Sequence, residues 1–538
     1  MIHQLTYKRA EQPWEFEQIY RLNYETFVEE IPQHQQSDTR LLVDKFNDEN
    51  TYFIALSQDQ ALHGMLAIRD RRPFSLDSKL ENLDALIPPA KSMCEVRLLS
   101  VRQGVRNGVV LMGLLTQLYE YLLVMGYDLV LISGILNQQK LYRHIGFIPF
   151  GPVVGSGEAR FQPMYLKREN IQIPGSILPE EIVSFLPGPV ELPESVNAAL
   201  SRPAVSHRSP GFLKKLDDIK SKLCALSKAN YAEILTGSGT LANDVITAHL
   251  TLLGQKGLIL SNGEFGERLI DHAKRFSLDF EICRKDWGDA FEPPAVERLL
   301  KSDPNIRWLF MVHCESSTGM LNPLTEIQAL CDAYQVKLCV DVISALGNVD
   351  LDLRGVYMAS ATSSKGIGSY CGLGIVFYNT LLPPSAGRLP RSLDLHKFHE
   401  ESGVPYTLSS NLVEALYTAL TTIDYDKRRQ TLSVVSHKLC EDLEALGLPP
   451  LISGSHAAAA ILTIPLPEAV SGLHLGDYLK YKGFLISYES AYLVRRNWIQ
   501  VCLMGDLKPE RAAALAEVIK TYVKQRAELV ISKENSAV

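Results

Sequence analysis

Two ionisable side chains interrupt apolar or small-residue segments in the middle of the sequence. Asp341 follows the apolar run KLCV, and Lys365 follows the small-residue run MASATSS. A carboxylate at the end of a buried strand can hold a ring nitrogen protonated, and a lysine amine can bond covalently to an aldehyde. The pair therefore suits the two ends of one aldehyde-bearing heteroaromatic ring, provided that the fold brings them together.

Further polar and aromatic groups follow apolar segments of the same region. The run TGSGTLAND comes after YAEIL and opens a helical pattern, so its small residues and free N–H groups suit a phosphate. Ser317 comes at the end of the apolar segment that contains WLFMV, and Phe265 follows GLILS. A phosphate cradle, an aromatic face, a carboxylate, a hydroxyl and a lysine are the groups that pyridoxal phosphate needs.

The elements that must position these groups alternate between strand and helix. Such alternation predicts a largely parallel sheet covered by helices on both faces, with ligands at the carboxyl ends of the strands. Strands are expected at 231–235, 257–261, 280–286, 306–315, 336–341, 358–362 and 372–379, with helices at 239–252, 264–276, 295–302 and 326–335.

The N-terminal part has a different order of elements. We expect strands at 50–57, 61–70, 93–101, 127–134 and 162–167, and helices at 109–126 and 137–147. This order predicts a mixed α/β sheet with a crossover connection. With two prolines and a glycine interrupting the pattern between the two regions, the predicted organisation is a domain at 1–170, a linker at 171–184, a large domain at 185–400 and a small domain at 401–538.

The N-terminal motifs CEVRLLSV, RQGVRNGVVLMGLL and LYRHIGF resemble the GNAT acyltransferases, although the loop lacks the family's usual Arg/Gln-x-x-Gly-x-Gly/Ala run. The resemblance implies that acetyl-CoA or another acyl-CoA binds by its pyrophosphate at Arg106, Asn107 and Gly108, and that Tyr142 protonates the departing thiolate. RLLVDKFNDENTYFIAL is similar to acyl-homoserine-lactone synthases, which leaves an acyl-carrier protein open as the donor.

Residues 185–530 resemble the class V aminotransferases of PLP fold type I. FLPGPVELPESVNAAL, HRSPGF, GSGT, NGEFGER, ESSTGMLNPL and DVISALGNVDLDL occur in the family's order. The resemblance implies an α/β large domain followed by a small α+β domain. The residues that it implies are Ser238, Gly239 and Thr240 on the phosphate, Phe265 and Ile343 on the two ring faces, Ser317 on the ring hydroxyl, Asp341 on the ring nitrogen, Ser364 at a phosphate-binding position and Lys365 as the Schiff-base lysine.

The resemblance also bears on subunits and substrate. Thr407 matches a threonine that reaches the phosphate of a neighbouring subunit, which implies a homodimer with shared sites. The family's carboxylate-binding arginine is replaced by Gln500, and Arg495 and Arg496 are the nearby candidates to take its place. Gly188, in the entry motif, is the remaining residue expected to bind substrate.

The sequence thus predicts an enzyme with two activities. One moves an amino group from a small amino donor to a 2-oxo acid by a ping-pong Schiff-base mechanism, and the other is an N-acyltransferase. Two alternatives stay open at this point. The first is a PLP-dependent lyase or desulfurase-like reaction, and the second is an N-terminal module that binds CoA or a carrier protein without catalysis.

Composition restricts the partners. The net charge is −7 with no basic block, which argues against nucleic acid or an anionic membrane surface. The N-terminal stretch lacks the apolar core of a signal peptide, and no window is apolar enough to span a membrane. The nine cysteines contain no C-x-x-C pair, so we expect free thiols in the cytoplasm and no metal site.

Overall fold

The computed structural model describes residues 5–106, 108–157, 159–171, 179 and 181–535. The chain forms two compact units, unit 1 (Met1–Glu180 with Thr521–Val538) and unit 2 (Glu181–Lys520). Most of the predicted linker, at 172–178 and 180, lies outside the described residues. Its last two residues form a strand, β9 (Val183–Ser184), which pairs with a strand of unit 2. The predicted boundary at residue 400 stays a prediction.

Unit 1 is built on an eight-stranded mixed sheet with the order β1-β2-β3-β4-β5-β8-β6, in which β7 also pairs with β8. Only β4 and β5 are parallel, and the helix predicted at 109–126 makes the crossover between them. The strands are β1 (Thr6–Arg9), β2 (Thr51–Leu56), β3 (Leu62–Arg69), β4 (Met93–Val101), β5 (Leu129–Ile135), β6 (Ile148–Pro149), β7 (Val154–Ser156) and β8 (Ala159–Lys167).

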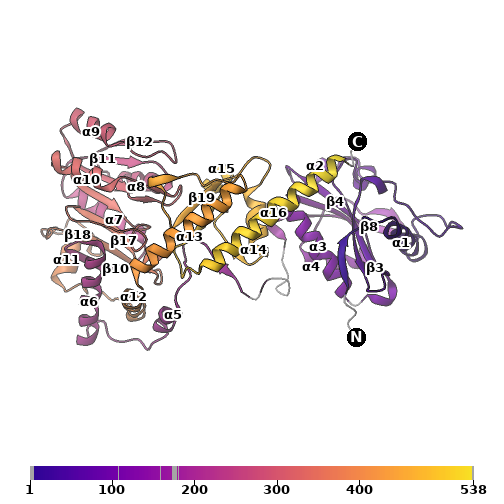
Figure 1. Ribbon diagram of the computed structural model, residues 1–538, viewed down its shortest axis with the longest axis horizontal. Coiled ribbons are helices and arrows are strands. Elements are labelled where there is room, and N and C mark those ends of the chain that lie inside the picture. Colours follow the sequence, from indigo (N-terminus) through magenta and orange to yellow (C-terminus); the bar gives the residue numbers. More distant parts are fainter. Residues whose placement is uncertain (1–4, 107, 158, 172–178, 180, 536–538) are drawn as a thin grey trace. The chain divides into compact units, whose positions relative to one another are not determined.

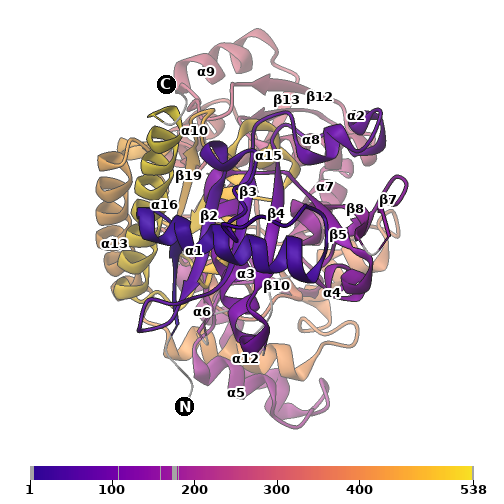
Figure 2. The same ribbon diagram turned by 90° about the vertical axis from the view of Figure 1, so that its right-hand side faces the viewer.

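Successive side chains of a strand point to opposite faces of the sheet. Both faces of this sheet carry apolar side chains, and helices cover both. Phe53 and Ala55 of β2 pack in one cluster with Leu114 of α3 (Val109–Met125), which crosses β2 and β3 (Figure 2). Tyr52 of the same strand packs on the other face with Ile19 of α1 (Pro13–Tyr24). Two further helices, α2 (Leu83–Leu86) and α4 (Gln139–Ile145), complete unit 1 before the chain enters unit 2.

Unit 2 contains a seven-stranded sheet with the order β10-β18-β17-β16-β13-β11-β12. β18 is antiparallel to both of its neighbours and the other pairs are parallel, which confirms the predicted largely parallel sheet. The strands are β10 (Tyr231–Thr236), β11 (Lys256–Ser261), β12 (Phe280–Arg284), β13 (Ile306–Val312), β16 (Lys337–Asp341), β17 (Met358–Thr362) and β18 (Leu373–Tyr378).

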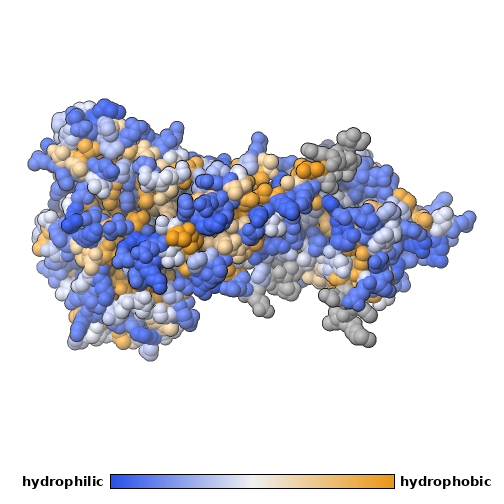
Figure 3. Space-filling model, viewed as in Figure 1, coloured by the Kyte–Doolittle hydropathy of each residue, from blue (hydrophilic) through white to orange (hydrophobic). Residues whose placement is uncertain are grey.

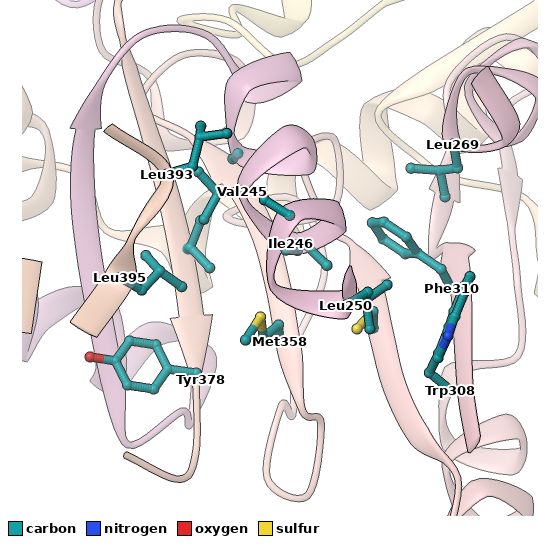
Figure 4. Close-up of a cluster of buried hydrophobic side chains, with 14 of the residues drawn as sticks. Val245, Ile246, Leu250, Leu269, Trp308, Phe310, Met358, Tyr378, Leu393 and Leu395 are labelled. Atoms are coloured by element: carbon teal, nitrogen blue, oxygen red, sulfur yellow. The ribbon is translucent and has the colours of Figure 1, made fainter. Parts of the chain in front are cut away.

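Helices cover this sheet, and an apolar cluster forms where α7 (Gly239–Thr251) meets it (Figures 1 and 4). The fully buried Trp308 of β13 lies against β11, where a Cβ on Gly257 would come within 2.0 Å of the indole. The other helices of this part are α5 (Glu194–Leu200), α6 (Pro210–Ser227), α8 (Glu264–Arg275), α9 (Pro293–Ser302), α10 (Leu324–Ala333) and α11 (Leu395–Glu400).

The last part of unit 2 is α+β. The apolar pattern of GFLISYES predicts a strand at 483–490, but only Phe484–Leu485 (β20) pairs, and it pairs with β9. The elements are α12 (Ser410–Thr422), α13 (Tyr425–Ala445), β19 (Ile461–Pro465), α14 (Gly472–Tyr481), α15 (Ala491–Arg496), β21 (Trp498–Cys502) and α16 (Pro509–Asn535), whose residues from Thr521 onward belong to unit 1. Earlier in unit 2, a small hairpin joins β14 (Cys314–Glu315) to β15 (Met320–Leu321).

The surface of unit 2 in the view of Figure 3 is largely hydrophilic, with scattered apolar residues. Within the described part of the chain, no helix has both the length and the apolar character that a membrane crossing requires. All nine cysteines are described, and all are free thiols.

Candidate functional site

Asp341 and Lys365 lie at the carboxyl edge of the sheet of unit 2. Asp341 ends β16, and its parallel neighbour β17 places Ser360 opposite it. Lys365 follows β17 after two serines and begins a short turn with a φ of +58°, a left-handed conformation that residues with a side chain seldom adopt. Neighbouring strands therefore bring both residues to the edge where such sheets bind ligands.

Asp341 is a buried carboxylate held by neutral donors. It is 4% exposed and accepts hydrogen bonds from Nδ2 of Asn243 at 2.8 Å and from the N–H of Ile343 at 2.9 Å. Asn243 is oriented in turn by the hydroxyl of Ser360. Burial raises the pKa of Asp341, and the hydrogen bonds and the charge of Lys365 oppose that rise only in part. A protonated ring nitrogen is the kind of partner that keeps such a carboxylate ionised.

The amine of Lys365 is poised for covalent chemistry. Its Nζ donates to Oγ of Ser344 at 3.3 Å and lies 5.7 Å from the centroid of the Phe265 ring. Burial lowers the pKa of Lys365, which favours the neutral, nucleophilic amine. Phe265 therefore lies within reach of the lysine, as the predicted stacking role requires.

A fully buried carboxylate, Glu315, fixes Phe265 and Ser317. It accepts hydrogen bonds from the N–H groups of Phe265, Gly266 and Ser317, at 3.1, 3.0 and 3.1 Å, and from Oγ of Ser317 at 2.5 Å. The same Oγ accepts from the N–H of Glu264 at 3.0 Å. Burial raises the pKa of Glu315, and these hydrogen bonds act against the rise. The network ties the start of α8 to the loop after β13.

The predicted phosphate cradle is the start of α7. Ser238 is the residue before the first turn, and Gly239 and Thr240 begin the helix, where backbone N–H groups have no partner within the helix. A Cβ on Gly239 would come within 2.6 Å of Cδ1 of Ile343, so glycine is needed for these segments to pack. Oγ of Ser364 lies 3.3 Å from Oγ1 of Thr362, beside the lysine.

Gln500 is held by the protein itself. It is 1% exposed, and its amide nitrogen donates to the carbonyl of Ser316 at 2.6 Å and to Oγ1 of Thr463 at 2.8 Å. Both amide hydrogens are thereby used. Arg495 is exposed and bonds to the carbonyl of Ala491 in its own helix.

Gly188 and Thr407 are exposed. Among the described residues, no hydrogen bond links either of them to the cluster around Lys365. Their predicted roles stay predictions.

In unit 1, the predicted pyrophosphate loop is only partly described. Asn107 lies outside the described residues. Gly108 precedes α3 with a φ of +83°, and a Cβ there would meet no atom within 4 Å. Arg106 forms a two-pronged ion pair with Glu30, with both contacts at 2.6 Å, so its guanidinium faces a carboxylate of the protein.

Tyr142 of α4 packs against β5. A Cβ on Gly134 would come within 2.7 Å of its ring, and Phe147 lies edge-on at 6.5 Å. Burial raises the pKa of Tyr142, so its hydroxyl stays protonated at neutral pH. That state is the one that a proton donor requires, and whether Tyr142 has this role stays a prediction.

A charged cavity of about 460 Å³ lies in unit 1, away from the residues that the sequence indicated. The buried Glu95 of β4 lines it and accepts from Oγ of Ser75 at 2.5 Å and from the N–H groups of Ser75 and Leu76 at 2.7 and 3.2 Å. Arg97, two residues along the same strand, pairs in two-pronged fashion with Asp44 at 2.8 and 3.0 Å. Such a cavity suits a small zwitterion.

A second cavity in unit 1, of about 300 Å³, is apolar. Leu115, Leu118 and Leu122 of α3 line one side, and Leu141 and Ile145 of α4 line the other. A cavity of this size and lining suits an alkyl chain.

A family model described as aminotransferase class-V matches residues 191–484. The chain belongs to the class V aminotransferase family. A second model, described as N-acyl amino acid synthase FeeM, matches residues 18–167, which confirms the GNAT-like resemblance of the N-terminal part.

Relatives of this class V aminotransferase support the assignment. This chain is 25% identical over 385 residues to a bifunctional phosphonoacetaldehyde hydrolase/aminoethylphosphonate transaminase of Clostridioides difficile. The match covers 68% of this chain and 60% of that protein, so the chain spans less than two-thirds of that relative. It is 26% identical over 367 residues to a 2-aminoethylphosphonate–pyruvate transaminase of Aeromonas hydrophila, over 64% and 95% of the two chains.

Among solved structures, an alanine–glyoxylate aminotransferase from Nostoc superposes with a TM-score of 0.58 at 26% identity, over 66% of this chain and 98% of that one. The match confirms the fold type I architecture predicted for the aminotransferase part.

Membership of the class V family implies pyridoxal phosphate, and the residues present fit it. Among the described residues, Asp341 is buried without an ion pair, the amine of Lys365 donates one weak hydrogen bond, and the start of α7 has no side-chain cap on its N–H groups. These are an acid partner, an amine and a phosphate cradle at one edge of one sheet.

Several residues of these sites were not singled out from the sequence. Asn243 and Glu315 lie inside the motifs TGSGTLAND and ESSTG, but nothing in the motifs shows that their side chains point inward. Glu95 and Arg97 lie two residues apart on one strand. This spacing could have predicted that their side chains point to the same face of the sheet. Lys79, which also lines the charged cavity, comes from a loop without periodicity.

Proposed function

We propose that unit 2 is a PLP-dependent aminotransferase that moves an amino group between a small amine or amino acid and a 2-oxo acid. The observation that carries the proposal is the placement of Asp341 and Lys365 at the carboxyl ends of adjacent parallel strands in a class V chain. When bound, pyridoxal phosphate supplies an aldehyde carbon that accepts an amine and a ring that accepts electrons.

The residues of unit 2 then have separate tasks. Lys365 acts as a neutral amine at first and afterwards carries a proton to and from the substrate carbon, a task for which its lowered pKa suits it. Asp341, held by Asn243, keeps a proton on the ring nitrogen by its buried negative charge. Ser238, Gly239 and Thr240 bind the phosphate, and Phe265 and Ile343 confine the ring between them.

We propose that unit 1 is an N-acyltransferase. The charged cavity would bind an amine that carries an acid group, with Arg97 and Lys79 supplying positive charge. Glu95 would take the proton that the attacking amine loses, since Glu95 lines the cavity and its carboxylate, with three hydrogen bonds accepted, can accept one more. The apolar cavity would hold the acyl chain, delivered by an acyl-CoA or by an acyl-carrier protein.

The two activities fit in sequence, because an aminotransferase produces the kind of amine that an N-acyltransferase consumes. The test is to incubate the PLP-loaded full-length protein with a panel of amino donors, including L-alanine, L-aspartate and 2-aminoethylphosphonate, and to follow the absorption of the cofactor. A spectral change with formation of a 2-oxo or aldehyde product supports the proposal. No change with any donor would refute it.

The lyase or desulfurase-like alternative is distinguished by product. Loss of a side-chain fragment from the donor, with the amino group retained, would favour it. Cys371 is the exposed cysteine of the described chain and follows Lys365 in the same loop region. A Cys371→Ser variant that keeps amino transfer excludes a role for that thiol. For unit 1, binding of an acyl-CoA without acyl transfer would favour a binding module.

We further propose a homodimer in the cytoplasm. Thr407 is exposed, as a residue that reaches a neighbouring subunit must be before assembly, and the free thiols are typical of a reducing compartment. Light scattering of the full-length protein tests the dimer, and a mass of one chain, 60.0 kDa, would contradict it.

A further inference from the structure

A half-buried arginine in unit 2, Arg496, is stacked on aromatic rings, and Glu264 acts on its charge only from a distance, without an ion pair among the described residues. The guanidinium carbon of Arg496 lies 3.7 Å from the centroid of the Trp287 ring and 5.4 Å from that of Trp498. Stacking occupies the face of the guanidinium, whereas its five N–H donors lie in its plane and stay available. Among the residues that the structure describes, no carboxylate pairs with it and no acceptor takes a hydrogen bond from it.

The backbone around Arg496 is fixed rather than loose. Arg496 ends α15, and Asn497 follows in a left-handed conformation with a φ of +54°. The side chain of Asn497 accepts from the N–H of Gly472 at 2.8 Å and donates to the carbonyl of Val470 at 2.9 Å. The backbone that carries Arg496 and Trp498 is therefore held in place before any ligand arrives.

A continuous line of contacts joins this arginine to the reactive lysine. Trp287 packs on Tyr492 at 5.8 Å, and the hydroxyl of Tyr492 donates to Oε1 of Gln500 at 3.4 Å. Gln500 donates to the carbonyl of Ser316, the hydroxyl of Ser316 pairs with that of Ser344, and Ser344 accepts from Nζ of Lys365.

Three side chains that could also bind an anion are engaged differently from Arg496. Gln500 has used both amide hydrogens on Ser316 and Thr463. Arg495 points along its own helix in solvent. Arg268, which lies 4.7 Å from the Phe265 ring, is already paired with Glu264.

We propose that Arg496 binds the acid group, a carboxylate or a phosphonate, of the substrate of unit 2, and that this contact replaces the one which Gln500 no longer makes. The assignment deepens the proposed aminotransferase function and rests on it for the identity of the ligand as substrate. A planar fork with free in-plane donors is matched to an oxyanion that accepts two parallel hydrogen bonds. The indoles exclude water from the face of the cation and strengthen that contact.

The test is equilibrium binding of acids that cannot react. The PLP-loaded full-length protein is titrated by calorimetry with propanoate and with ethylphosphonate, which carry the acid group without an amine or an oxo group. Arg496→Gln should weaken binding of the preferred acid by about tenfold or more, since a hydrogen-bonded charge is lost. Arg496→Lys keeps the charge without the fork, so its affinity should lie between those of the wild type and Arg496→Gln.

Arg495→Gln is the discriminating variant, because it removes the same charge from the neighbouring position. A loss of binding there, with Arg496→Gln unchanged, overturns the assignment, as does a wild-type protein that binds neither acid. Thermal unfolding of each variant establishes that it is folded. Where Arg496→Gln is not, the comparison of Arg496→Lys with Arg495→Gln decides the assignment.

Turnover separates this inference from the proposed function. With donors that carry an acid group, Arg496→Gln should raise KM by about tenfold or more with kcat nearly unchanged, whereas KM for ethanolamine, an amine without an acid group, should stay the same. If donors react and KM does not change, the inference is wrong and the proposed function stands. If no donor reacts but acid binding depends on Arg496, the proposed function fails and the anion site stands.

Discussion

Two fully buried carboxylates, Glu315 in unit 2 and Glu95 in unit 1, are held in the same way and differ in what they face. Each accepts backbone N–H groups and a serine hydroxyl, and each has 0% of its surface exposed. Glu95 lines a cavity of about 460 Å³. Glu315 instead lies between the start of α8 and the loop after β13, and all of its contacts given above are to protein.

This difference indicates that the buried carboxylate has a different role in each unit. A carboxylate that opens onto a cavity can exchange a proton with a ligand. One that is enclosed by N–H donors can only hold those donors in place. Glu315 is therefore a positioning residue for Phe265 and Ser317, whereas Glu95 lines the cavity in which acyl transfer is proposed.

The substitution with the largest expected effect should abolish the activity of unit 2 and leave that of unit 1 intact. Lys365→Ala should reduce amino transfer below detection, because Lys365 is the lysine that acts on Asp341 within the described part of the chain. Borohydride reduction followed by mass spectrometry should attach cofactor to the wild-type peptide and not to the variant. Acyl transfer by unit 1 should be unaffected. A reducible adduct that persists in the folded variant would contradict the assignment of Lys365.

The converse substitution acts on unit 1. Glu95→Gln should lower the rate of acyl transfer by about 10²- to 10⁴-fold, the usual contribution of a general base. Steady-state assays with an acyl-CoA and a panel of amino acids measure it, and amino transfer in the same protein sample serves as the control. An acyl-transfer rate equal to that of the wild type would remove Glu95 from the mechanism.

Glu315→Gln should act on stability and cofactor binding together. The amide nitrogen that replaces one oxygen leaves two buried N–H groups without an acceptor, so we expect a loss of about 4 kcal/mol in the free energy of unfolding, at 1–3 kcal/mol for each group. Urea unfolding measures it, and equilibrium dialysis should show weaker binding of pyridoxal phosphate.

Glu264→Gln is the matched control for this variant. It alters a carboxylate one residue from Phe265 that pairs with Arg268 in an exposed i,i+4 arrangement, and such pairs contribute at most about 0.5 kcal/mol. Equal losses in the two variants would show that the enclosed network has no special role.

A smaller effect concerns the stability of unit 2 at acidic pH. Burial lowers the pKa of His249 in α7 to about 4, below its ordinary 6.5, and Nε2 accepts from the N–H of Leu395 at 3.1 Å. The unfolded chain therefore takes up this proton first as the pH falls. Unit 2 should keep the contribution of His249 above pH 6.5 and lose up to roughly 3 kcal/mol between pH 6.5 and 4.

Urea unfolding at a series of pH values tests this loss. His249→Gln keeps an acceptor near the position of Nε2 and cannot be protonated, so the pH dependence should become shallower. His437→Gln, which changes an exposed histidine, should leave it as it is. A wild-type curve without a slope between pH 6.5 and 4 would contradict the prediction.

Much of the fold was predictable from the spacing of apolar residues and from the order of the predicted strands and helices. The alternation of apolar strands with helices predicted the parallel sheet, and the glycine after residue 125 predicted where α3 ends, since Gly126 closes that helix with a φ of +78°. The positions of Asp341 and Lys365 at strand ends followed from the same pattern. The strand predicted at 483–490 was overestimated, because an apolar run does not show how many of its residues find a partner.

The polar networks were not predictable in the same way. Which oxygen accepts which N–H depends on segments far apart in the sequence, as with Glu315 and Gly266 or Asn243 and Asp341. The sequence offered both Arg495 and Arg496 as candidates to replace the arginine that is Gln500 here, and only side-chain packing distinguishes the two arginines. In unit 1, periodicity alone did not mark the cavity-facing side of β4.

The segment from Thr521 onward belongs to unit 1, where Arg526 bonds to the carbonyl of Val124 and Leu529 packs on the apolar cluster around α3. On a ribosome that adds about 5–20 residues per second, the rest of unit 1 is finished roughly 20–70 s before this segment emerges. During that interval an apolar surface on the nascent N-terminal part stays uncovered. The acyltransferase half thus reaches its final form only after the aminotransferase half has been synthesised, and chaperones have a defined period in which to act on it.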